Sequence, residues 1–151
     1  MKMRIAGIET FSMVNGEGCR FVIFTQGCAH HCKQCHNPET WDFNGGTEID
    51  TDDLAQQISA KLKKHPLDGI TLSGGDPFYQ QDACCDLLKK LPKGTNVWCY
   101  TGFRYEDIKN TELAQLCDTI VDGEFVASQK CDGKMYGSNN QRIIRKGQVV
   151  G

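Results

Sequence analysis

The sequence contains no long hydrophobic run: no stretch approaches the roughly 18 apolar residues that mark a membrane-spanning helix. The opening residues, MKMRIAG, are not followed by the apolar segment of a secretory signal peptide. These absences exclude the membrane-bound and exported classes. We therefore expect a soluble, cytoplasmic protein whose cysteines stay reduced.

Long runs of a single charge are also absent. The 151 residues include 17 lysines and arginines against 19 aspartates and glutamates, which gives a formal net charge of -2. A nucleic-acid-binding domain usually carries a basic patch or stripe, so we expect no nucleic-acid partner. Linkers, repeats and low-complexity segments are missing too. A chain of this length then predicts one domain over residues 1–151.

Cysteine, by contrast, is abundant. The chain has nine cysteines, and this odd number, together with their clustering, argues against a disulfide framework and for metal or redox chemistry. The segment GCAHHCKQCHN, residues 27–37, holds Cys28, Cys32 and Cys35 beside three histidines. The scattered remainder are predicted to be small buried hydrophobic side chains: Cys19, Cys84, Cys85, Cys99, Cys117 and Cys131.

The spacing of the three clustered cysteines favours iron over zinc. A structural zinc site usually takes its ligands in two pairs, and the chain has no second Cys-x2-Cys pair. His36 offers a fourth zinc ligand, but it adjoins Cys35, and adjacent side chains seldom reach one ion together. Three thiolates on one loop suit a 4Fe-4S cluster with one open iron. A structural zinc module, or an iron-sulfur carrier without catalysis, is the alternative.

Apolar, β-branched segments alternate with amphipathic ones along the chain, which indicates parallel βαβ units whose functional groups gather at the carboxyl ends of the strands. The predicted strands are 19–27, 69–75, 96–102 and 118–123, with a possible last strand at 141–145. The predicted helices are 51–65, capped by Thr51 and stopped by Pro66, then 80–91 and 105–117.

These strands number four to six, fewer than the eight of a closed barrel. We therefore expect an α/β fold, an open partial (β/α) barrel of mainly parallel strands. One side of such a barrel is uncovered, so it must be polar or be closed by a partner protein.

The Cys-x3-Cys-x2-Cys spacing of Cys28, Cys32 and Cys35 resembles that of the radical S-adenosylmethionine superfamily. SGGDPF, residues 73–78, follows the second predicted strand and is similar to the Gly-Gly-Glu motif of that superfamily. Alone, its two glycines would indicate a tight turn. Because they follow a strand and a three-cysteine loop, the functional interpretation is favoured.

Further motifs extend the resemblance over nearly the whole chain, to the activating enzymes of anaerobic, class III ribonucleoside-triphosphate reductase. The short chain and the last of these motifs favour this family over the similar, generally longer pyruvate formate-lyase activases. The motifs are VNGEG (14–18), CHNPETW (35–41), YTGF (100–103), VDGEF (121–125) and GSNNQRII (137–144).

The resemblance implies a partial barrel of the radical S-adenosylmethionine type and a mechanism. A 4Fe-4S cluster on the three clustered cysteines would bind and reductively cleave S-adenosylmethionine. The resulting 5'-deoxyadenosyl radical would take a hydrogen atom from a glycine of the partner reductase. The cofactors carry this chemistry, so no catalytic side chain is expected. A reduced flavodoxin or a similar protein would be the usual electron donor.

The resemblance also implies contacts to the cofactor. Gln34 replaces an aromatic residue that is common in the superfamily, so adenine contacts would come from Gln34, Cys35 and His36. Asp122 would meet the ribose hydroxyls or the amino group, or would only begin a turn before Gly123. The residues expected at the methionine end are Gly74, Gly75 and Asp76.

Two other kinds of enzyme remain open. One is a glycyl-radical-enzyme activase of the pyruvate formate-lyase type, and the other is a small-molecule radical enzyme such as the compact deazaguanine-forming synthase. For Arg142 and Arg145 of the tail, contact with the reductase and a plain polar strand edge are equally good interpretations.

Overall fold

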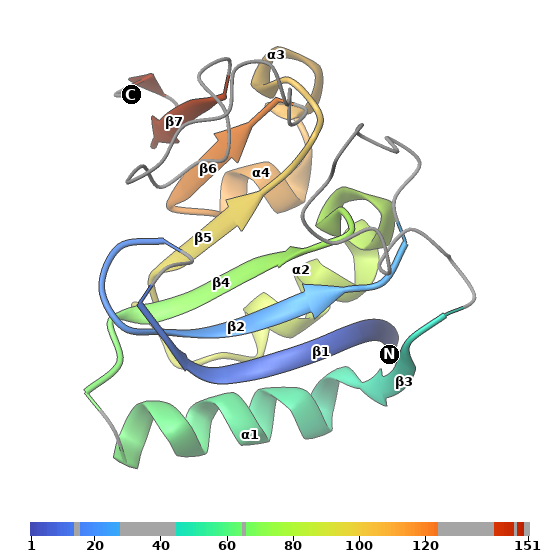
Figure 1. Cartoon of the computed structure of the whole chain (residues 1–151), viewed down its shortest axis with the longest axis vertical. Coiled ribbons are helices and arrows are strands. Elements are labelled where there is room, and N and C mark those ends of the chain that lie inside the picture. Colours follow the sequence, from blue (N-terminus) through green and yellow to red (C-terminus); the bar gives the residue numbers. More distant parts are fainter. Residues whose placement is uncertain (14–15, 28–44, 65, 124–140, 147, 150–151) are drawn as a thin grey trace.

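The computed structural model describes residues 1–13, 16–27, 45–64, 66–123, 141–146 and 148–149. They build one mixed sheet of eight strands in the order β3-β1-β2-β4-β5-β6-β7-β8 (Figure 1). The strands are β1 (Lys2–Ser12), β2 (Arg20–Thr25), β3 (Thr47–Asp50), β4 (Gly69–Gly74), β5 (Val97–Tyr100), β6 (Thr119–Asp122), β7 (Arg142–Arg145) and β8 (Gln148–Val149). The helices are α1 (Thr51–Lys64), a 3-10 helix (Pro77–Gln80), α2 (Gln81–Lys89), α3 (Tyr105–Ile108) and α4 (Glu112–Leu116).

Four parallel strands, β2, β4, β5 and β6, form the centre of the sheet. They are the four strands that the apolar segments predict, and β7 is the predicted last strand. Antiparallel strands extend the sheet on both sides, with β1 and β3 beyond β2, and β7 and β8 beyond β6. The carboxyl ends of the four parallel strands therefore meet at one edge of the sheet.

The sheet differs from the expected four to six mainly parallel strands, because it has eight strands and four of its pairings are antiparallel. Sequence patterns miss β1 and β3 because KMRIAGIETFS and TEID are largely exposed or half-buried and lack a continuous apolar run. These segments become strands by pairing with each other, Lys2 opposite Asp50 and Ile5 opposite Thr47. The partial barrel itself stays a prediction.

The helices α1, α2 and α4 lie on one face of the sheet (Figure 1). Alternate strand residues point toward this face and form the main core with them. Each fully buried side chain of this size contributes roughly 1.5 to 3 kcal/mol. None of the helices within the described residues has the length and apolar character to cross a membrane. Fully buried core residues are Phe21, Ile23, Leu54, Ile58, Ile70, Leu72 and Leu87.

The start of α1 differs from the prediction in its capping residue. Thr51 is already the first residue of the helix, and the Asp52 amide donates to Oδ1 of Asp50 at 2.9 Å. The hydroxyl of Thr51 donates instead to the carboxylate of Asp86 on α2. Asp50 thus does the capping, and Thr51 joins α1 to α2.

The predicted helix 105–117 is in fact two short helices, α3 and α4. Thr111 interrupts it with an extended backbone, and its hydroxyl accepts the Ala114 amide at 3.2 Å. Threonine favours this arrangement because its side chain competes for backbone amides and so starts a new helix.

The amino-terminal edge of the parallel strands is filled by Arg20, which is almost fully buried. Its guanidinium donates to Oγ1 of Thr71 at 2.9 Å and to the carbonyl oxygens of Ile70 and Asn96 at 2.8 and 3.0 Å. It also lies 5.7 Å from the ring of Trp98. Burial lowers the pKa of Arg20 to about 10, so the side chain stays charged at neutral pH.

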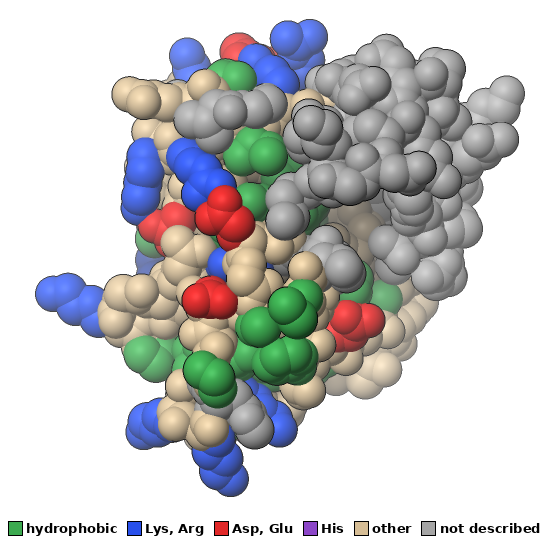
Figure 2. Space-filling view, turned by 60° about the vertical axis from the view of Figure 1, so that its left-hand side comes forward, with side chains coloured by type: hydrophobic (Ala, Val, Ile, Leu, Met, Phe, Trp, Pro, Cys, Tyr) green, Lys and Arg blue, Asp and Glu red, His purple; other side chains and the backbone are tan. Residues whose placement is uncertain are grey.

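The β1–β2 connection closes the same edge. Gly16 has a φ of +103°, and a Cβ there would lie 2.9 Å from the Arg20 side chain and 3.1 Å from Trp98. Arg145 of β7 forms an ion pair with Glu17, and its guanidinium lies 5.4 Å from the Trp98 ring. Figure 2 looks onto this end of the molecule and shows acidic and basic side chains next to each other. The described part of the VNGEG motif, residues 16–18, thus packs at the amino-terminal ends of the parallel strands, opposite the carboxyl ends where the candidate site lies.

Candidate cofactor site at the strand ends

The cysteine loop leaves the sheet at the carboxyl end of β2. That strand ends at Thr25, and Gly27, with a φ of +110°, is the last described residue before the loop. The predicted cluster ligands and adenine contacts therefore lie outside the described residues. These are Cys28, Cys32, Gln34, Cys35 and His36.

The Gly-Gly-Asp segment lies directly against the start of this loop. The Gly75 amide donates to the Thr25 carbonyl at 2.8 Å, and the Asp76 amide donates to the Gly27 carbonyl at 3.0 Å. The exit of β4 is thereby fixed to the exit of β2. The described residues thus place the Gly-Gly-Asp segment against Gly27, the residue before Cys28.

Gly74 is required by this close approach. Its φ of +95° lies in the left-handed region that favours glycine, and its Cα faces the backbone of Thr25. The observed reason for Gly74 is therefore the packing of β4 on β2. Contact of Gly74 and Gly75 with the methionine end of a cofactor stays a prediction.

Asp76 is fully buried, and its carboxylate is used within the chain. Oδ1 accepts the Phe78 amide at 3.0 Å, which caps the 3-10 helix, and Oδ2 accepts the Gly102 amide at 2.8 Å. Oγ1 of Thr101 lies 2.9 Å from both oxygens. Asp76 thus joins the exits of β4 and β5. From sequence, Asp76 is also expected to contact the methionine end directly. That contact stays a prediction.

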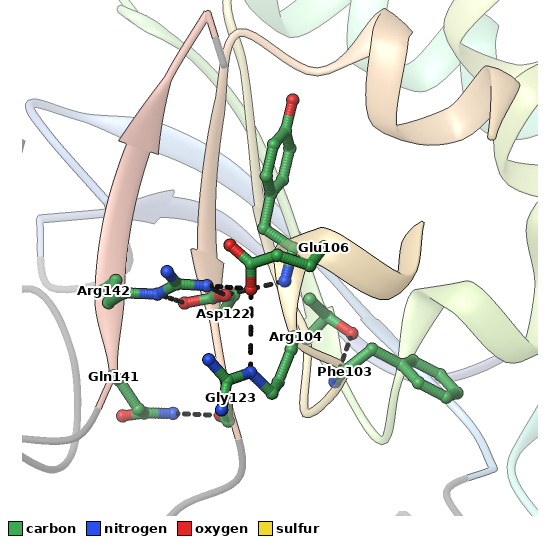
Figure 3. Close-up of polar contacts among 9 residues, drawn as sticks. Phe103, Arg104, Glu106, Asp122, Gly123, Gln141 and Arg142 are labelled. Atoms are coloured by element: carbon green, nitrogen blue, oxygen red, sulfur yellow. Dashed lines mark hydrogen bonds and ion pairs between the residues drawn. The ribbon is translucent and has the colours of Figure 1, made fainter. Parts of the chain in front are cut away.

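Asp122 at the end of β6 is also almost fully buried and engaged (Figure 3). Its Oδ2 accepts the Tyr105 amide at 2.7 Å, and Arg142 donates to both oxygens, from Nε at 3.1 Å and from Nη2 at 2.5 Å. Gly123 follows with a φ of +95°. The observed contacts are those of a structural carboxylate that begins a turn. A contact with ribose or the amino group stays a prediction.

Arg142 also holds a second carboxylate, that of Glu106 at 2.8 Å (Figure 3). The hydrogen bond from Arg142 lowers the pKa of Glu106 to about 2, while the bond to Asp122 raises the pKa of Arg142. Nε2 of Gln141 donates to the Gly123 carbonyl at 2.9 Å. These contacts join the residues at which segment 124–140 leaves β6 and returns to β7. Arg142 and Arg145 both form ion pairs inside the chain.

Gln80 supports the site, although sequence analysis does not single it out. Its Nε2 donates to the carbonyl oxygens of Arg4 at 2.7 Å and Gln26 at 3.0 Å, and its Oε1 accepts the Arg4 amide at 2.9 Å. The side-chain amide of Gln80 thereby forms hydrogen bonds with backbone groups of β1 and of the residue that follows β2. A glutamine at the end of a 3-10 helix carries no sequence signal for this role.

Most of the other cysteines in the described part of the chain are buried. Cys84, Cys85, Cys99 and Cys117 are buried, which confirms that part of the prediction, whereas Cys19 is partly exposed and Cys131 lies outside the described residues. Burial raises the pKa of Cys85 to about 11 and also raises the pKa values of Cys84 and Cys99. Iron is bound by thiolates. Within the described ranges no three metal-ligating side chains gather. The predicted ligands Cys28, Cys32 and Cys35 lie outside those ranges, and their role stays a prediction.

Comparison with known proteins indicates the class of cofactor. The family model of a 4Fe-4S single cluster domain matches residues 14–144, so the protein belongs to the class of iron-sulfur proteins. This match supports the expected 4Fe-4S cluster.

Curated relatives identify the family more closely. The anaerobic ribonucleoside-triphosphate reductase-activating protein of Enterobacteria phage T4 is 35% identical over 135 residues, covering 86% of both chains. The proteins of the same name from Haemophilus influenzae and Escherichia coli K12 are 34% and 32% identical over 88% and 87% of this chain, and 92% and 91% of their own. The chain belongs to the family of anaerobic ribonucleoside-triphosphate reductase-activating proteins.

Proposed function

We propose that this protein is a radical S-adenosylmethionine enzyme, an oxidoreductase that generates a glycyl radical on an anaerobic ribonucleoside-triphosphate reductase. The observation that carries the proposal is the pair of bonds between the Gly-Gly-Asp segment and the start of the cysteine loop, Gly75 to Thr25 and Asp76 to Gly27. They bring the half-buried backbone of Gly74 and Gly75 beside Gly27, the residue before the first expected cluster ligand. The names of the relatives supply the reaction partner.

In this proposal the chain binds and orients cofactors. Cys28, Cys32 and Cys35 hold the 4Fe-4S cluster, and one iron is left for S-adenosylmethionine. The bound cofactors supply the chemistry, reductive cleavage to a 5'-deoxyadenosyl radical that removes hydrogen from a glycine. Gly74 and Gly75 present backbone to the methionine end, and residues 34–36 present backbone or side chains to the adenine.

The proposed reaction also requires two protein partners, the reductase and an electron donor. The uncovered face of a partial barrel would admit the glycine loop of the reductase. A reduced flavodoxin or a similar protein would deliver the electron, in the reducing cytoplasm.

The test is anaerobic reconstitution with iron and sulfide. The protein should bind about four irons and four sulfides per chain. With reductant and S-adenosylmethionine, it should produce the doublet of a glycyl radical in electron paramagnetic resonance, and only when the reductase is present. Stoichiometric zinc in an active protein would refute the cluster. Rapid turnover of a nucleoside or pterin, without a radical on the reductase, would favour a small-molecule enzyme instead.

A further inference from the structure

Asp76 connects three strand exits. Its amide donates to the Gly27 carbonyl beyond β2, its own residue follows β4, and its carboxylate accepts bonds from Thr101 and Gly102 beyond β5. No part of the carboxylate reaches the surface, because the residue is fully buried. One residue therefore links the three exits, through its backbone amide to the exit of β2 and through its carboxylate to the exit of β5.

The arrangement requires a carboxylate. Each of its two oxygens faces a backbone amide, Oδ1 that of Phe78 at 3.0 Å and Oδ2 that of Gly102 at 2.8 Å. An asparagine amide has one oxygen and one NH2 group, so in either orientation one backbone N–H would face a donor. A buried donor without an acceptor is unfavourable by more than an ordinary hydrogen bond contributes.

Thr101 completes the unit. Its hydroxyl has one hydrogen to donate to the Asp76 carboxylate, and it accepts the Phe103 amide at 3.1 Å. The residue is itself buried. Thr101 therefore fixes the turn after β5 on the carboxylate, and removing its hydroxyl would leave the carboxylate in place with one donor fewer.

We propose that Asp76 is a positioning residue: its buried carboxylate, held by Thr101 and Gly102, fixes the Gly-Gly segment in the geometry that binds S-adenosylmethionine, without touching the cofactor. This inference rests on the proposed function. It assigns the acidic position of the motif to the support of the site rather than to its surface. Both carboxylate oxygens already accept donors from this chain, which leaves the backbone of Gly74 and Gly75 to face the cofactor.

The test compares Asp76→Asn with a matched control, Asp118→Asn. Asp118 also joins neighbouring strands through a carboxylate, since its Oδ2 accepts the Val97 amide at 2.8 Å and its Oδ1 pairs with Lys146. It lies at the opposite edge of the sheet. Iron content, S-adenosylmethionine affinity and the electron paramagnetic resonance spectrum of the reduced cluster are measured on the anaerobically reconstituted proteins.

Asp76→Asn should keep its iron, raise the Kd of S-adenosylmethionine roughly tenfold, and weaken the change that the cofactor causes in the cluster spectrum. Asp118→Asn should keep both the affinity and the spectrum. Wild-type affinity in Asp76→Asn would overturn the inference, and so would an equal loss in Asp118→Asn, which would indicate a general loss of stability.

A second pair separates positioning from direct contact and decides the case if Asp76→Asn fails to load iron. Thr101→Val removes the hydroxyl but leaves the carboxylate, so it should lower the affinity, and Thr101→Ser should restore it. If Thr101→Val binds S-adenosylmethionine as tightly as wild type, positioning is refuted. If wild-type protein with an intact cluster binds no S-adenosylmethionine, the proposed function itself fails. This result can be told apart from wild-type affinity in Asp76→Asn or Thr101→Val, which would refute only the positioning role.

Discussion

Gly74 and Thr25 meet backbone to backbone: a Cβ added to Gly74 would lie 2.4 Å from both the amide nitrogen and the carbonyl oxygen of Thr25. Gly75, the next residue, donates its amide to that same carbonyl. The two glycines of the motif therefore have different constraints, since Gly74 is held by the packing of β4 on β2. We propose that Gly75 is held by the cofactor.

Substitution of the two glycines should separate folding from binding. Gly74→Ala should lower the free energy of unfolding by roughly 2 kcal/mol or more, because the left-handed backbone and the collision with Thr25 are both unfavourable. Gly75→Val should still fold and hold its cluster but lose S-adenosylmethionine binding, since a side chain would occupy the space of the ligand. Denaturation of the apo proteins and binding to the reconstituted ones would check this. Equal losses of stability in both variants would contradict it.

The cysteines should divide into two groups. Replacing Cys28, Cys32 or Cys35 by alanine should abolish cluster binding and activation, since each supplies one of three ligands. Cys84→Ala and Cys117→Ala serve as controls, because both thiols are buried in the core. They should lower stability by about 1 to 2 kcal/mol through a small cavity and keep the iron. Loss of iron in a control variant would show that the ligand set is wrong.

The loop cysteines and the buried cysteines should also differ in their reactivity toward oxygen and toward alkylating reagents. An iron without a thiolate ligand is open to oxygen, so exposure should bleach the cluster and free the three loop thiols. Cys84 and Cys99 should stay unmodified by iodoacetamide in the folded protein, because burial raises their pKa and the thiolate is the reactive form. Mass spectrometry of labelled peptides reads this out. A protein that kept its colour and its activity for hours in air would rule out the three-ligand cluster.

The Glu106–Arg142 contact should give stability a specific pH dependence. The pKa of Glu106 is lowered from 4.5 to about 2 in the folded chain. Its stabilising effect is therefore complete above about pH 4.5 and is lost as the pH falls toward 2. The difference in unfolding free energy between wild type and Glu106→Gln, measured on apo protein, should shrink over that interval. Because Glu106 is exposed, added salt should reduce the difference as well, and a constant difference would contradict the assignment.

Arg142 itself should matter more, because Asp122 is buried. Arg142→Leu would leave the Asp122 carboxylate with the Tyr105 amide as its remaining described donor, at a loss of about 2 to 3 kcal/mol, allowing for the partial exposure of Arg142. Arg145→Leu offers a comparison, since its partner Glu17 is exposed. Denaturant titration of both apo variants measures the two losses. A smaller loss for Arg142→Leu than for Arg145→Leu would show that the buried pair is not the stronger one.

The central strands and the motifs at their ends could be predicted from sequence because β2 and β4 are rich in apolar and β-branched residues and a glycine follows or closes each of them. The edge strand β3 could not, because TEID is polar and becomes a strand only by pairing with β1. The division of residues 105–117 depends on one hydroxyl, that of Thr111, which periodicity does not register.

The candidate site shows the same limit. Sequence places Asp76 and Asp122 at strand ends, where carboxylates often meet ligands. It cannot show which donors reach them. The guanidinium on Asp122 comes from Arg142, 20 residues further along the chain, and the hydroxyl on Asp76 comes from Thr101, 25 residues further along. Thr101 and Arg142 reach these carboxylates because β5 lies next to β4 and β7 lies next to β6 in the sheet.

The position of Trp98 gives the protein an optical probe of its own. The chain has two tryptophans, Trp41 and Trp98. Trp98 is buried, and the guanidinium groups of Arg20 and Arg145 lie 5.7 and 5.4 Å from its ring. Trp41 lies, by its sequence number, in the segment that contains the cysteines. In a Trp41→Phe protein the remaining fluorescence would report only on the amino-terminal edge of the sheet. Emission could then follow the unfolding of that edge in apo protein separately from events in the cysteine segment.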